Sequence, residues 1–316
     1  MSLDFLGLDT SNYTTSAALY DGERAVNSSM LLPVKQGEAG VRQSDAVFHH
    51  TRQLPLVFEG LEFPSSLRAV AASVRPRNVK DSYMPCFLCG QGAAEMIART
   101  HGIPCYHTSH QIGHILAALY SARRLDMTDE PFIAFHVSGG TTDCLYCTPH
   151  RDDILEVKEI GTSLDLKAGQ LIDRTGLMLG LDFPCGIALE KLAVSYEGKI
   201  KAQPVMKGGN CCLSGFENKV QQFLREGHPG EEIAYYTLDA VYRTVLSMTR
   251  HALDEYGSLP VIYAGGVMSD RLIQQRLAQS LDNVYFSEPQ FSRDNAAGIA
   301  VFAYLMSQRR QQARDQ

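Results

Sequence analysis

Two stretches of the chain decide the fold: FLGLDTSNYTTSAALY at residues 5–20 and FIAFHVSGGTTDCLYC at residues 132–147. Each consists of an apolar strand, a turn of small polar residues and a second apolar strand, which is typical of a β-hairpin. Laid over each other without gaps, at an offset of 127 residues, they share Phe5/Phe132, Ser11/Ser138, Thr14/Thr141 and Thr15/Thr142. This echo predicts an internal duplication in which each half opens with a hairpin.

The remainder of the chain alternates strands with helices. We predict strands at 5–9, 16–20, 68–74, 132–137, 143–147 and 260–264 from their apolar runs. Helical periodicity indicates helices near 42–60, 91–101, 110–122, 186–196, 232–256 and 270–281. A chain of 316 residues is longer than a domain with a single hydrophobic core usually is, so we expect two α/β lobes. The first comprises residues 1–127, completed by a helix at 292–316, and the second comprises residues 128–291.

Composition excludes several classes of protein. With 29 Lys+Arg and 35 Asp+Glu the net charge is -6, and 45% of the residues are hydrophobic, which excludes a disordered or collagen-like chain. No apolar run reaches the roughly 18 residues of a membrane span, and the start MSLDFLGLD has no signal-peptide pattern. We therefore expect a cytoplasmic protein that does not bind membranes.

The eight cysteines are spread along the chain, which favours reduced thiols over a disulfide framework. Cys86/Cys89 and Cys144/Cys147 have CxxC spacing, and four such thiolates can form a zinc site. Both pairs lie in strand-like apolar runs without the glycine-rich knuckle of zinc ribbons. Buried structural cysteines are therefore the favoured interpretation.

The two hairpin turns are candidates for phosphate binding. Small hydroxylated residues and glycines, such as those of SGGTT at 138–142, let backbone N–H groups approach a phosphate closely. A tight turn in a sheet is the alternative for one such segment alone, but two facing hairpins predict a nucleotide cleft between the lobes. The strand–glycine–helix segment VIYAGGVMSDRL (261–272) is a second, weaker signal of this kind.

A group of histidines occurs in HTSHQIGHILAAL, residues 107–119. His107, His110 and His114 would share one face of a helix, and His110 and His114 at i and i+4 can present two imidazoles to one metal. A polar helix face is the alternative. A zinc peptidase of the HExxH type is disfavoured because Gln111 cannot act as the carboxylate base.

A carboxylate near the C-terminus can complete this metal site. The segment SRDNAAGIAVFAYL (292–305) begins a small, apolar helix for which Asp294 is a natural N-cap. If this helix packs against the first lobe, Asp294 becomes a third ligand. Two histidines and one carboxylate suit iron or zinc with open positions for substrate.

Six motifs follow one another along the chain: LGLDTSNYTTSAALYD, HQIGH, VSGGTT, AGQLIDRTGLMLGLDFPCGIALEKLA, AGGVMSD and SRDNAAGIA. Together and in this order, they resemble the TsaD family of tRNA N6-adenosine threonylcarbamoyltransferases, once named O-sialoglycoprotein endopeptidases. The resemblance runs from about residue 5 to about residue 305. It implies an actin-like, Hsp70-like ATPase (ASKHA) fold of two duplicated α/β lobes with a central cleft.

The resemblance also implies an acyltransferase reaction. Threonylcarbamoyl-adenylate gives its threonylcarbamoyl group to N6 of adenosine 37 in tRNA and releases AMP. The family's motifs place a divalent metal, iron or zinc, on His110, His114 and Asp294. The implied substrate and nucleotide residues are Ser138, Gly139, Gly140, Thr141, Thr142, Gly169, Asp173, Gly186, Gly265, Gly266 and Asp270. No catalytic residue is assigned.

Several positions depart from the family's pattern. Tyr13 and Thr14 stand where the family has an adjacent Asp-Glu pair, and SVRPRNVKDSYMP (73–85) replaces a Gly-Pro-Gly-rich turn. Asp270 replaces an asparagine on the adenine side, and Arg174 replaces a lysine. These departures leave open a divergent paralogue that binds metal and nucleotide as a regulatory subunit, or that transfers a carbamoyl group to another acceptor.

The net charge bears on RNA binding, which needs a basic surface. The local candidates are Arg75, Arg77, Lys80 and the tail QRRQQAR (308–314), for which a solvated helix end is the favoured interpretation. We therefore expect that tRNA is bound with the help of partners such as TsaB-like and TsaE-like subunits.

Overall fold

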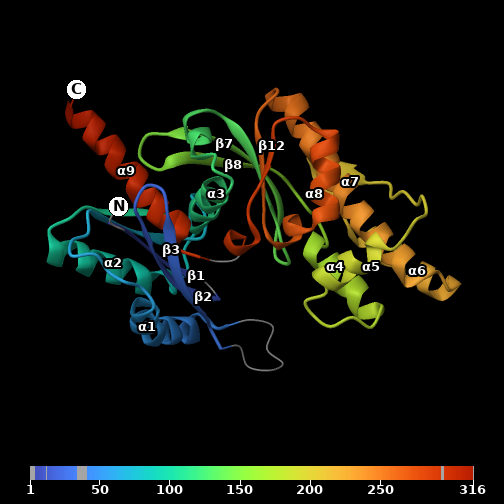
Figure 1. Ribbon diagram of the computed structural model, residues 1–316, viewed down its shortest axis with the longest axis horizontal. Helices are drawn as coiled ribbons and strands as arrows, with labels where there is room; N and C mark the ends of the chain where they lie inside the picture. The colour runs from blue at the N-terminus through green and yellow to red at the C-terminus, as the bar shows by residue number, and fades with distance from the viewer. Residues whose placement is uncertain (1–3, 12, 34–40, 293–294, 316) are drawn as a thin grey trace. The chain divides into compact units, whose positions relative to one another are not determined.

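The computed structural model describes residues 4–11, 13–33, 41–292 and 295–315 (Figure 1). The chain forms two compact units. Unit 1 comprises residues 1–128, 149–156 and 293–316, and unit 2 comprises residues 129–148 and 157–292.

Unit 1 contains a five-stranded sheet in the order β3-β2-β1-β4-β5. Its strands are β1 (Phe5–Ser11), β2 (Thr14–Tyr20), β3 (Ala25–Leu31), β4 (Ala69–Arg75) and β5 (Cys105–Ser109). Its helices are α1 (Gln43–Glu59), α2 (Phe87–His101), α3 (His110–Ser121) and α9 (Ala297–Asp315), with η1 (Leu125–Asp129) at its edge. β1 pairs antiparallel with β2 and parallel with β4, which pairs parallel with β5.

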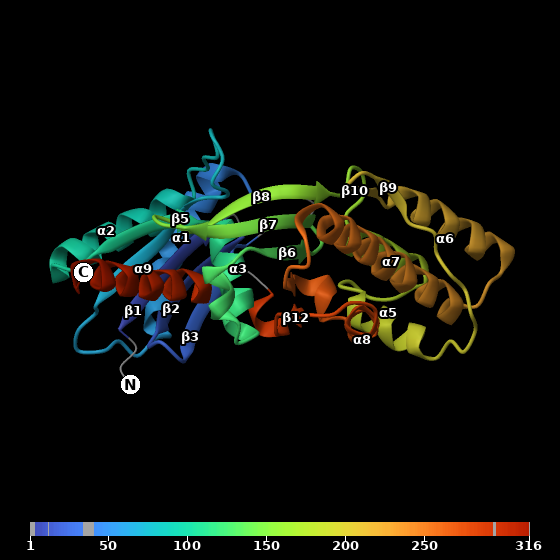
Figure 2. The same ribbon diagram turned by 90° about the horizontal axis from the view of Figure 1, so that it is seen from above.

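The alternation of residues along β1 explains how helices cover this sheet. Leu6 and Leu8 belong to a buried cluster with Val57 of α1 and Ala94 of α2. The intervening Gly7 meets α9, since a Cβ at Gly7 would lie 2.2 Å from the backbone nitrogen of Ala300. Figure 2 shows α9 running along the sheet.

Unit 2 contains a second five-stranded sheet, in the order β12-β11-β6-β7-β8. Its strands are β6 (Phe132–Val137), β7 (Thr142–His150), β8 (Ile154–Thr162), β11 (Val261–Ala264) and β12 (Val284–Phe286), and β9 (Val205–Lys207) pairs separately with β10 (Asn210–Cys212). Its helices are α4 (Ala168–Met178), α5 (Gly186–Val194), α6 (Ser214–Glu226), α7 (Gly230–Tyr256), α8 (Arg271–Ser280), η2 (Gly266–Ser269) and η3 (Pro289–Phe291). The long helix α7 contributes much of the core with β6 and β11.

The two sheets repeat one topology, and this confirms the predicted fold class. The hairpin β1–β2 corresponds to β6–β7, and the parallel neighbours β4 and β5 correspond to β11 and β12. The tip of the β7–β8 hairpin, residues 149–156, groups with unit 1 rather than with unit 2. There Arg309 donates from Nη1 to the carbonyl of His150 at 2.6 Å.

The cysteines are free thiols. Cys144 and Cys147 lie buried in β7, as the sequence predicts, and burial raises the pKa of both. The strand-like interpretation is wrong for Cys86 and Cys89, because Cys86 precedes α2 and Cys89 lies in its first turn. In the described part of the chain, no helix has the length and apolar character to cross a membrane.

Candidate functional site

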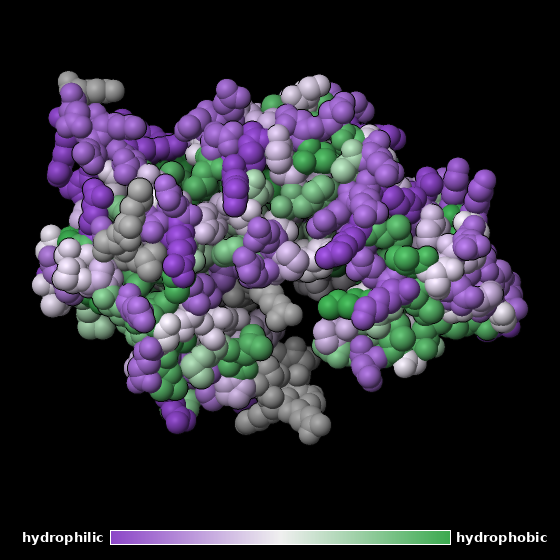
Figure 3. All heavy atoms as spheres, in the orientation of Figure 1, coloured by the Kyte–Doolittle hydropathy of each residue, from purple (hydrophilic) through white to green (hydrophobic). Residues whose placement is uncertain are grey.

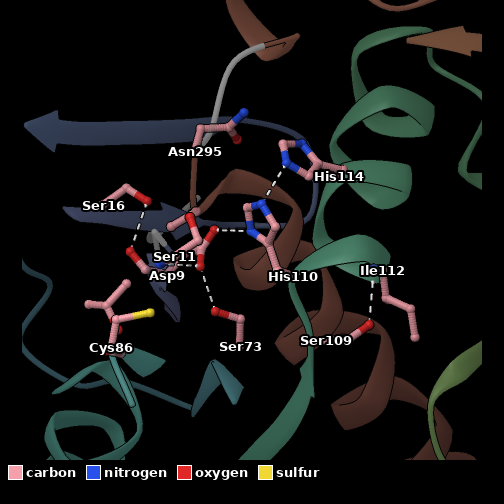
Figure 4. A network of polar contacts seen from close by, with 12 residues as sticks. Asp9, Ser11, Ser16, Ser73, Cys86, Ser109, His110, Ile112, His114 and Asn295 are labelled. Carbon is pink, nitrogen blue, oxygen red and sulfur yellow. Dashed lines mark hydrogen bonds and ion pairs between the residues drawn. The ribbon is translucent and has the colours of Figure 1, made fainter. Parts of the chain in front are cut away.

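Asp9 is the centre of a buried polar network in unit 1 (Figure 4). It lies near the carboxyl end of β1, and its carboxylate accepts hydrogen bonds from the hydroxyl of Ser73 at 2.6 Å and from the backbone N–H of Ser11 at 3.2 Å. The other carboxylate oxygen lies 2.7 Å from Nδ1 of His110. The ends of β1 and β4 and the start of α3 therefore meet at one carboxylate, at the edge where α/β sheets commonly bind ligands.

His110 and His114 form a pair on the first two turns of α3, which Ser109 caps by accepting from the N–H of Ile112. Their Nε2 atoms lie 2.8 Å apart. An ionised Asp9 carboxylate can only accept, so Nδ1 of His110 donates to it; in the neutral ring Nε2 of His110 is then the acceptor, and it faces Nε2 of His114. A carboxylate behind a histidine in this way is the usual support of a metal-binding imidazole.

This donor set fits the predicted metal in part. Two imidazole nitrogens converge, one of them oriented by a carboxylate, and His110 keeps 20% of its side chain exposed. The third predicted ligand, Asp294, lies outside the described residues. The described residues contain no cluster of three or more His, Cys, Asp or Glu side chains arranged to hold a metal.

The start of α9 lies beside the histidine pair. Figure 4 draws Asn295 next to His114. The side chain of Asn295 accepts from the N–H of Ala297, so a capping bond at this helix start comes from Asn295. The backbones of α9 and α3 are in close contact, because a Cβ at Gly298 would lie 1.8 Å from the carbonyl oxygen of Gly113.

His107 does not belong to this pair. The predicted common helix face is wrong for this residue, because it lies in β5, and its Nε2 is 3.4 Å from Oε1 of Glu95 on α2. The change from strand to helix at Ser109 separates it from His110.

The turn of the first hairpin is lined by hydroxyls and histidine instead of acidic residues. Thr15 donates to Oε1 of Gln53 at 2.7 Å and therefore accepts from Nδ1 of His50 at 2.8 Å. Burial lowers the pKa of His50 to about 4, so the ring is neutral at pH 7. Thr14 is buried, whereas Tyr13 is 42% exposed. The described groups here supply no replacement carboxylate on the turn.

The SGGTT turn forms the corresponding site in unit 2. Ser138 directly follows β6, and its hydroxyl accepts hydrogen bonds from the backbone N–H groups of Gly140 and Thr141, both at 3.2 Å. Gly139 and Gly140 are exposed, and a Cβ at either would meet nothing within 4 Å. The N–H groups of Gly140 and Thr141 are thus bonded within the turn, and the side of the turn at Gly139 and Gly140 is open.

Two further glycines bring their backbones onto this turn. Gly169, in the first turn of α4, donates to the carbonyl of Ser138 at 3.1 Å, and a Cβ there would lie 2.6 Å from the nitrogen of Gly139. Gly265 follows β11 with φ +99°, and a Cβ there would lie 2.3 Å from the carbonyl oxygen of Val137. The structure thus gathers residues 138–142, Gly169 and Gly265 at the carboxyl ends of β6 and β11.

The remaining nucleotide candidates lie on α4, α5 and the start of α8. Asp173 accepts from the N–H of Cys185 at 2.9 Å and so holds the turn that precedes Gly186, the first residue of α5. Arg174 pairs instead with Glu217 on α6, at 2.9 Å. Gly186 and Gly266 have open space where a Cβ would stand.

Asp270 is a buried cap. Its carboxylate accepts from the N–H of Ile273 at 2.9 Å, and the neighbouring N–H of Arg271 donates to Glu190 of α5. Burial, reinforced by the charge of Glu190, raises the pKa of Asp270 to about 6. The side chain is therefore costly to keep ionised in its present environment.

Sequence reasoning missed the polar partners that hold these sites. Asp9 was detectable as a carboxylate within an apolar strand, but its partner Ser73 comes from β4, 64 residues away. In unit 2, Asp165 accepts from the N–H groups of Leu166 and Leu213 and from the hydroxyl of Ser214. These hydrogen bonds hold the pKa of Asp165 below its usual range. No spacing pattern links such distant residues.

The family model of TsaD, tRNA N6-adenosine threonylcarbamoyltransferase, matches residues 64–301, about three-quarters of the chain. The chain belongs to the TsaD family. The match includes the histidine pair of α3 and the SGGTT turn, so it spans residues of both units. Membership places the chain among transferases with a nucleotide-binding ASKHA fold.

Solved structures with this fold are similar in shape and distant in sequence. Phosphate- and nucleotide-bound HypF has a TM-score of 0.60 and 14% identity, covering 97% of this chain and 46% of HypF. HypF of T. kodakarensis has a TM-score of 0.62 and 13% sequence identity, and the alignment covers 97% of this chain and 49% of HypF. The (R)-2-hydroxyglutaryl-CoA dehydratase component A of Acidaminococcus fermentans has a TM-score of 0.54 and 15% sequence identity. The alignment covers 96% of this chain and 98% of that protein. The chain thus spans about half the length of the HypF proteins, and the likeness shows the fold.

Proposed function

We propose that the chain transfers the threonylcarbamoyl group of threonylcarbamoyl-adenylate to N6 of adenosine 37 in tRNA. The observation that carries the proposal is the TsaD family match over residues 64–301, together with the oriented His110–His114 pair within it. The carbamoyl carbon of the substrate is part of a mixed anhydride, so AMP is already a good leaving group. The protein mainly has to position the two reactants and stabilise phosphate charge.

The residues of unit 2 supply the contacts for the adenylate. The open turn at 138–142 leaves space for the phosphate, and Gly169 brings the positive end of α4 against this turn. Asp173 and Asp270 are the acidic groups available to the ribose and adenine side. Asp270, with its pKa of about 6, can present either a carboxyl or a carboxylate near neutral pH.

The residues of unit 1 supply the metal ligands. His110 and His114 would hold iron or zinc, with Asp294 as the proposed third ligand. Asp9 keeps the lone pair of His110 Nε2 directed at the site by accepting from Nδ1–H. The bound metal would act as a Lewis acid toward substrate oxygens.

The direct test incubates the full chain with threonylcarbamoyl-adenylate and unmodified tRNA, with and without TsaB-like and TsaE-like proteins. Modified adenosine is measured by mass spectrometry. We expect product that requires both His110 and His114, so the double variant His110→Ala/His114→Ala loses it. His107→Ala is the matched control, because this histidine lies in β5 beside Glu95 and should leave product formation intact.

One observation favours a second candidate function. Tyr13 and Thr14 occupy the position of the family's Asp-Glu pair, and the surrounding side chains are hydroxyls and a neutral His50. A chain that binds the adenylate but has lost those acids could serve as a regulatory subunit, or transfer a carbamoyl group to another acceptor. Retained adenylate binding with no modified tRNA under any condition would establish this second function over the first.

A further inference from the structure

A hollow at the opposite edge of the unit 1 sheet has no part in the sites described above. It has a volume of about 440 Å³ and is lined by Arg68, Pro104, Tyr106, Ser307, Arg310, Gln311, Arg314 and Asp315. Arg68 and Pro104 immediately precede β4 and β5, whereas His110 follows β5. The hollow therefore lies at the amino ends of these parallel strands, away from the edge that carries Asp9 and the histidine pair.

The hollow is lined by three arginine side chains that have no acidic partner among the described residues. Arg310 and Arg314 are one turn apart on α9, and Arg68 reaches the same space from the sheet. None of the three forms an ion pair with a described residue; the guanidinium of Arg68 lies over the Phe5 ring, 5.3 Å from its centroid. Asp315 is the one acidic residue of the lining. Figure 3 shows hydrophilic residues gathered over this end of α9.

Two hydroxyls in the wall have unmet hydrogen-bonding capacity. The oxygens of Tyr106 and Ser307 are shielded from solvent and have no hydrogen-bond partner among the described residues. Buried hydroxyls nearly always have a partner. Tyr106 and Ser307 therefore add two unsatisfied hydroxyls to a wall that also carries three arginines.

We propose that this hollow binds a small phosphorylated molecule. Guanidinium groups recognise phosphate through paired, charge-assisted hydrogen bonds, and three of them with two hydroxyls match the oxygens of a phosphate monoester. The volume lies within the range of organic ligand pockets, which is larger than a phosphate group needs. Pro104 and the ring of Tyr106 give the organic part an apolar wall.

The test is calorimetric titration of the full chain with ribose 5-phosphate at low ionic strength, with ribose as the phosphate-free control. The variant Arg310→Gln/Arg314→Gln should weaken binding of ribose 5-phosphate at least about tenfold. Arg225→Gln/Arg250→Gln removes the same charge from exposed positions of unit 2 and should bind within about twofold of the parent. Equal binding by the Arg310/Arg314 variant and the parent would overturn the proposal.

A second variant separates binding from folding. Tyr106→Phe removes only a hydroxyl that has no partner among the described residues, so the melting temperature should stay the same or rise. We expect ribose 5-phosphate to bind this variant several-fold more weakly. Binding of ribose as tight as that of ribose 5-phosphate, or binding of a short single-stranded RNA without any binding of ribose 5-phosphate, would contradict the proposed ligand class.

Discussion

The hairpins β1–β2 and β6–β7 share one topology and use their polar residues in opposite ways. In the first, both strands are buried along their whole length, and Asp9, Thr10 and Thr15 make their hydrogen bonds to other protein groups. In the second, the glycines of the turn are exposed, and the hydroxyl of Ser138 organises N–H groups at the surface. The first hairpin buries its polar groups against other protein groups and orients His110, and the second exposes a glycine turn.

This contrast teaches that a duplicated element diverges through a few positions. At the offset of 127 residues, Asp9 corresponds to His136 and Gly7 corresponds to Ala134. The glycine admits the backbone of α9, and the carboxylate orients His110. The two hairpins therefore differ in the helices and side chains that contact them, and each difference can be tested by substitution.

The largest effect is expected from Gly7→Ala, which gives the first hairpin the residue found in the second. The new Cβ would lie 2.2 Å from the backbone nitrogen of Ala300, so α9 has to move away from the sheet. We expect the free energy of unfolding to fall by about 3 kcal/mol or more in urea denaturation followed by circular dichroism. Gly92→Ala in α2 is the control, because its Cβ meets nothing within 4 Å and should stabilise the helix by ~0.5–1 kcal/mol.

Asp270→Asn tests a buried charge near the second hairpin. The pKa of Asp270 is about 6 in the fold against an ordinary value of 3.8, so its stabilising contribution is present below about pH 4 and is lost as the pH rises through 6. The variant should be more stable than the parent by up to about 3 kcal/mol at pH 8 and similar to it at pH 4. Denaturation across this pH range measures the difference. The exposed control Asp254→Asn should show no such pH dependence, and a constant difference for Asp270→Asn would refute the assignment.

Asp9→Asn tests whether the first hairpin supports the metal ligands. An amide in place of the carboxylate weakens the hold on Nδ1 of His110, so we expect metal affinity to fall ~10–100-fold. Metal content by mass spectrometry after dialysis gives the readout, with circular dichroism to confirm folding. Glu59→Gln, an exposed position of the same unit, should retain the metal. Unchanged metal content in Asp9→Asn would show that the hairpin has no such role.

Gly169→Ala gives the smallest expected effect and tests the second hairpin. Its Cβ would press on the nitrogen of Gly139, 2.6 Å away, and displace the turn from the phosphate position. We expect AMP to bind roughly tenfold more weakly by calorimetry, since N–H donors at an anion site depend on position. Gly215→Ala at the start of α6 has open space and serves as the control. Full AMP affinity in Gly169→Ala would separate this turn from nucleotide binding.

The sequence predicted the fold through local patterns. The repeated hairpin and the alternation of strands with helices predicted two α/β halves, and the resemblance to the TsaD family implied the ASKHA fold. The i, i+4 spacing placed His110 and His114 on one helix face. The strand β5 was not predicted because its five residues, Cys105–Ser109, mix polar and apolar side chains without a period. His107 was therefore grouped with His110 and His114 on one helix face.

Tertiary partners explain what sequence could not predict. The contact of Asp9 with His110 joins residues 101 positions apart, and the approach of Gly298 to Gly113 depends on how two helices pack. The importance of a glycine or a buried carboxylate is set by which backbone or donor lies opposite it. Periodicity contains no information about such a partner.

The placement of α9 has a consequence for biosynthesis. This helix packs against β1 through Gly7 and against α3 through Gly113, yet the ribosome makes all of unit 2 between α3 and α9. The face of the unit 1 sheet that α9 covers therefore stays partly exposed until residues 297–315 have been synthesised. Unit 2 is therefore the first part of the chain that can finish folding during translation.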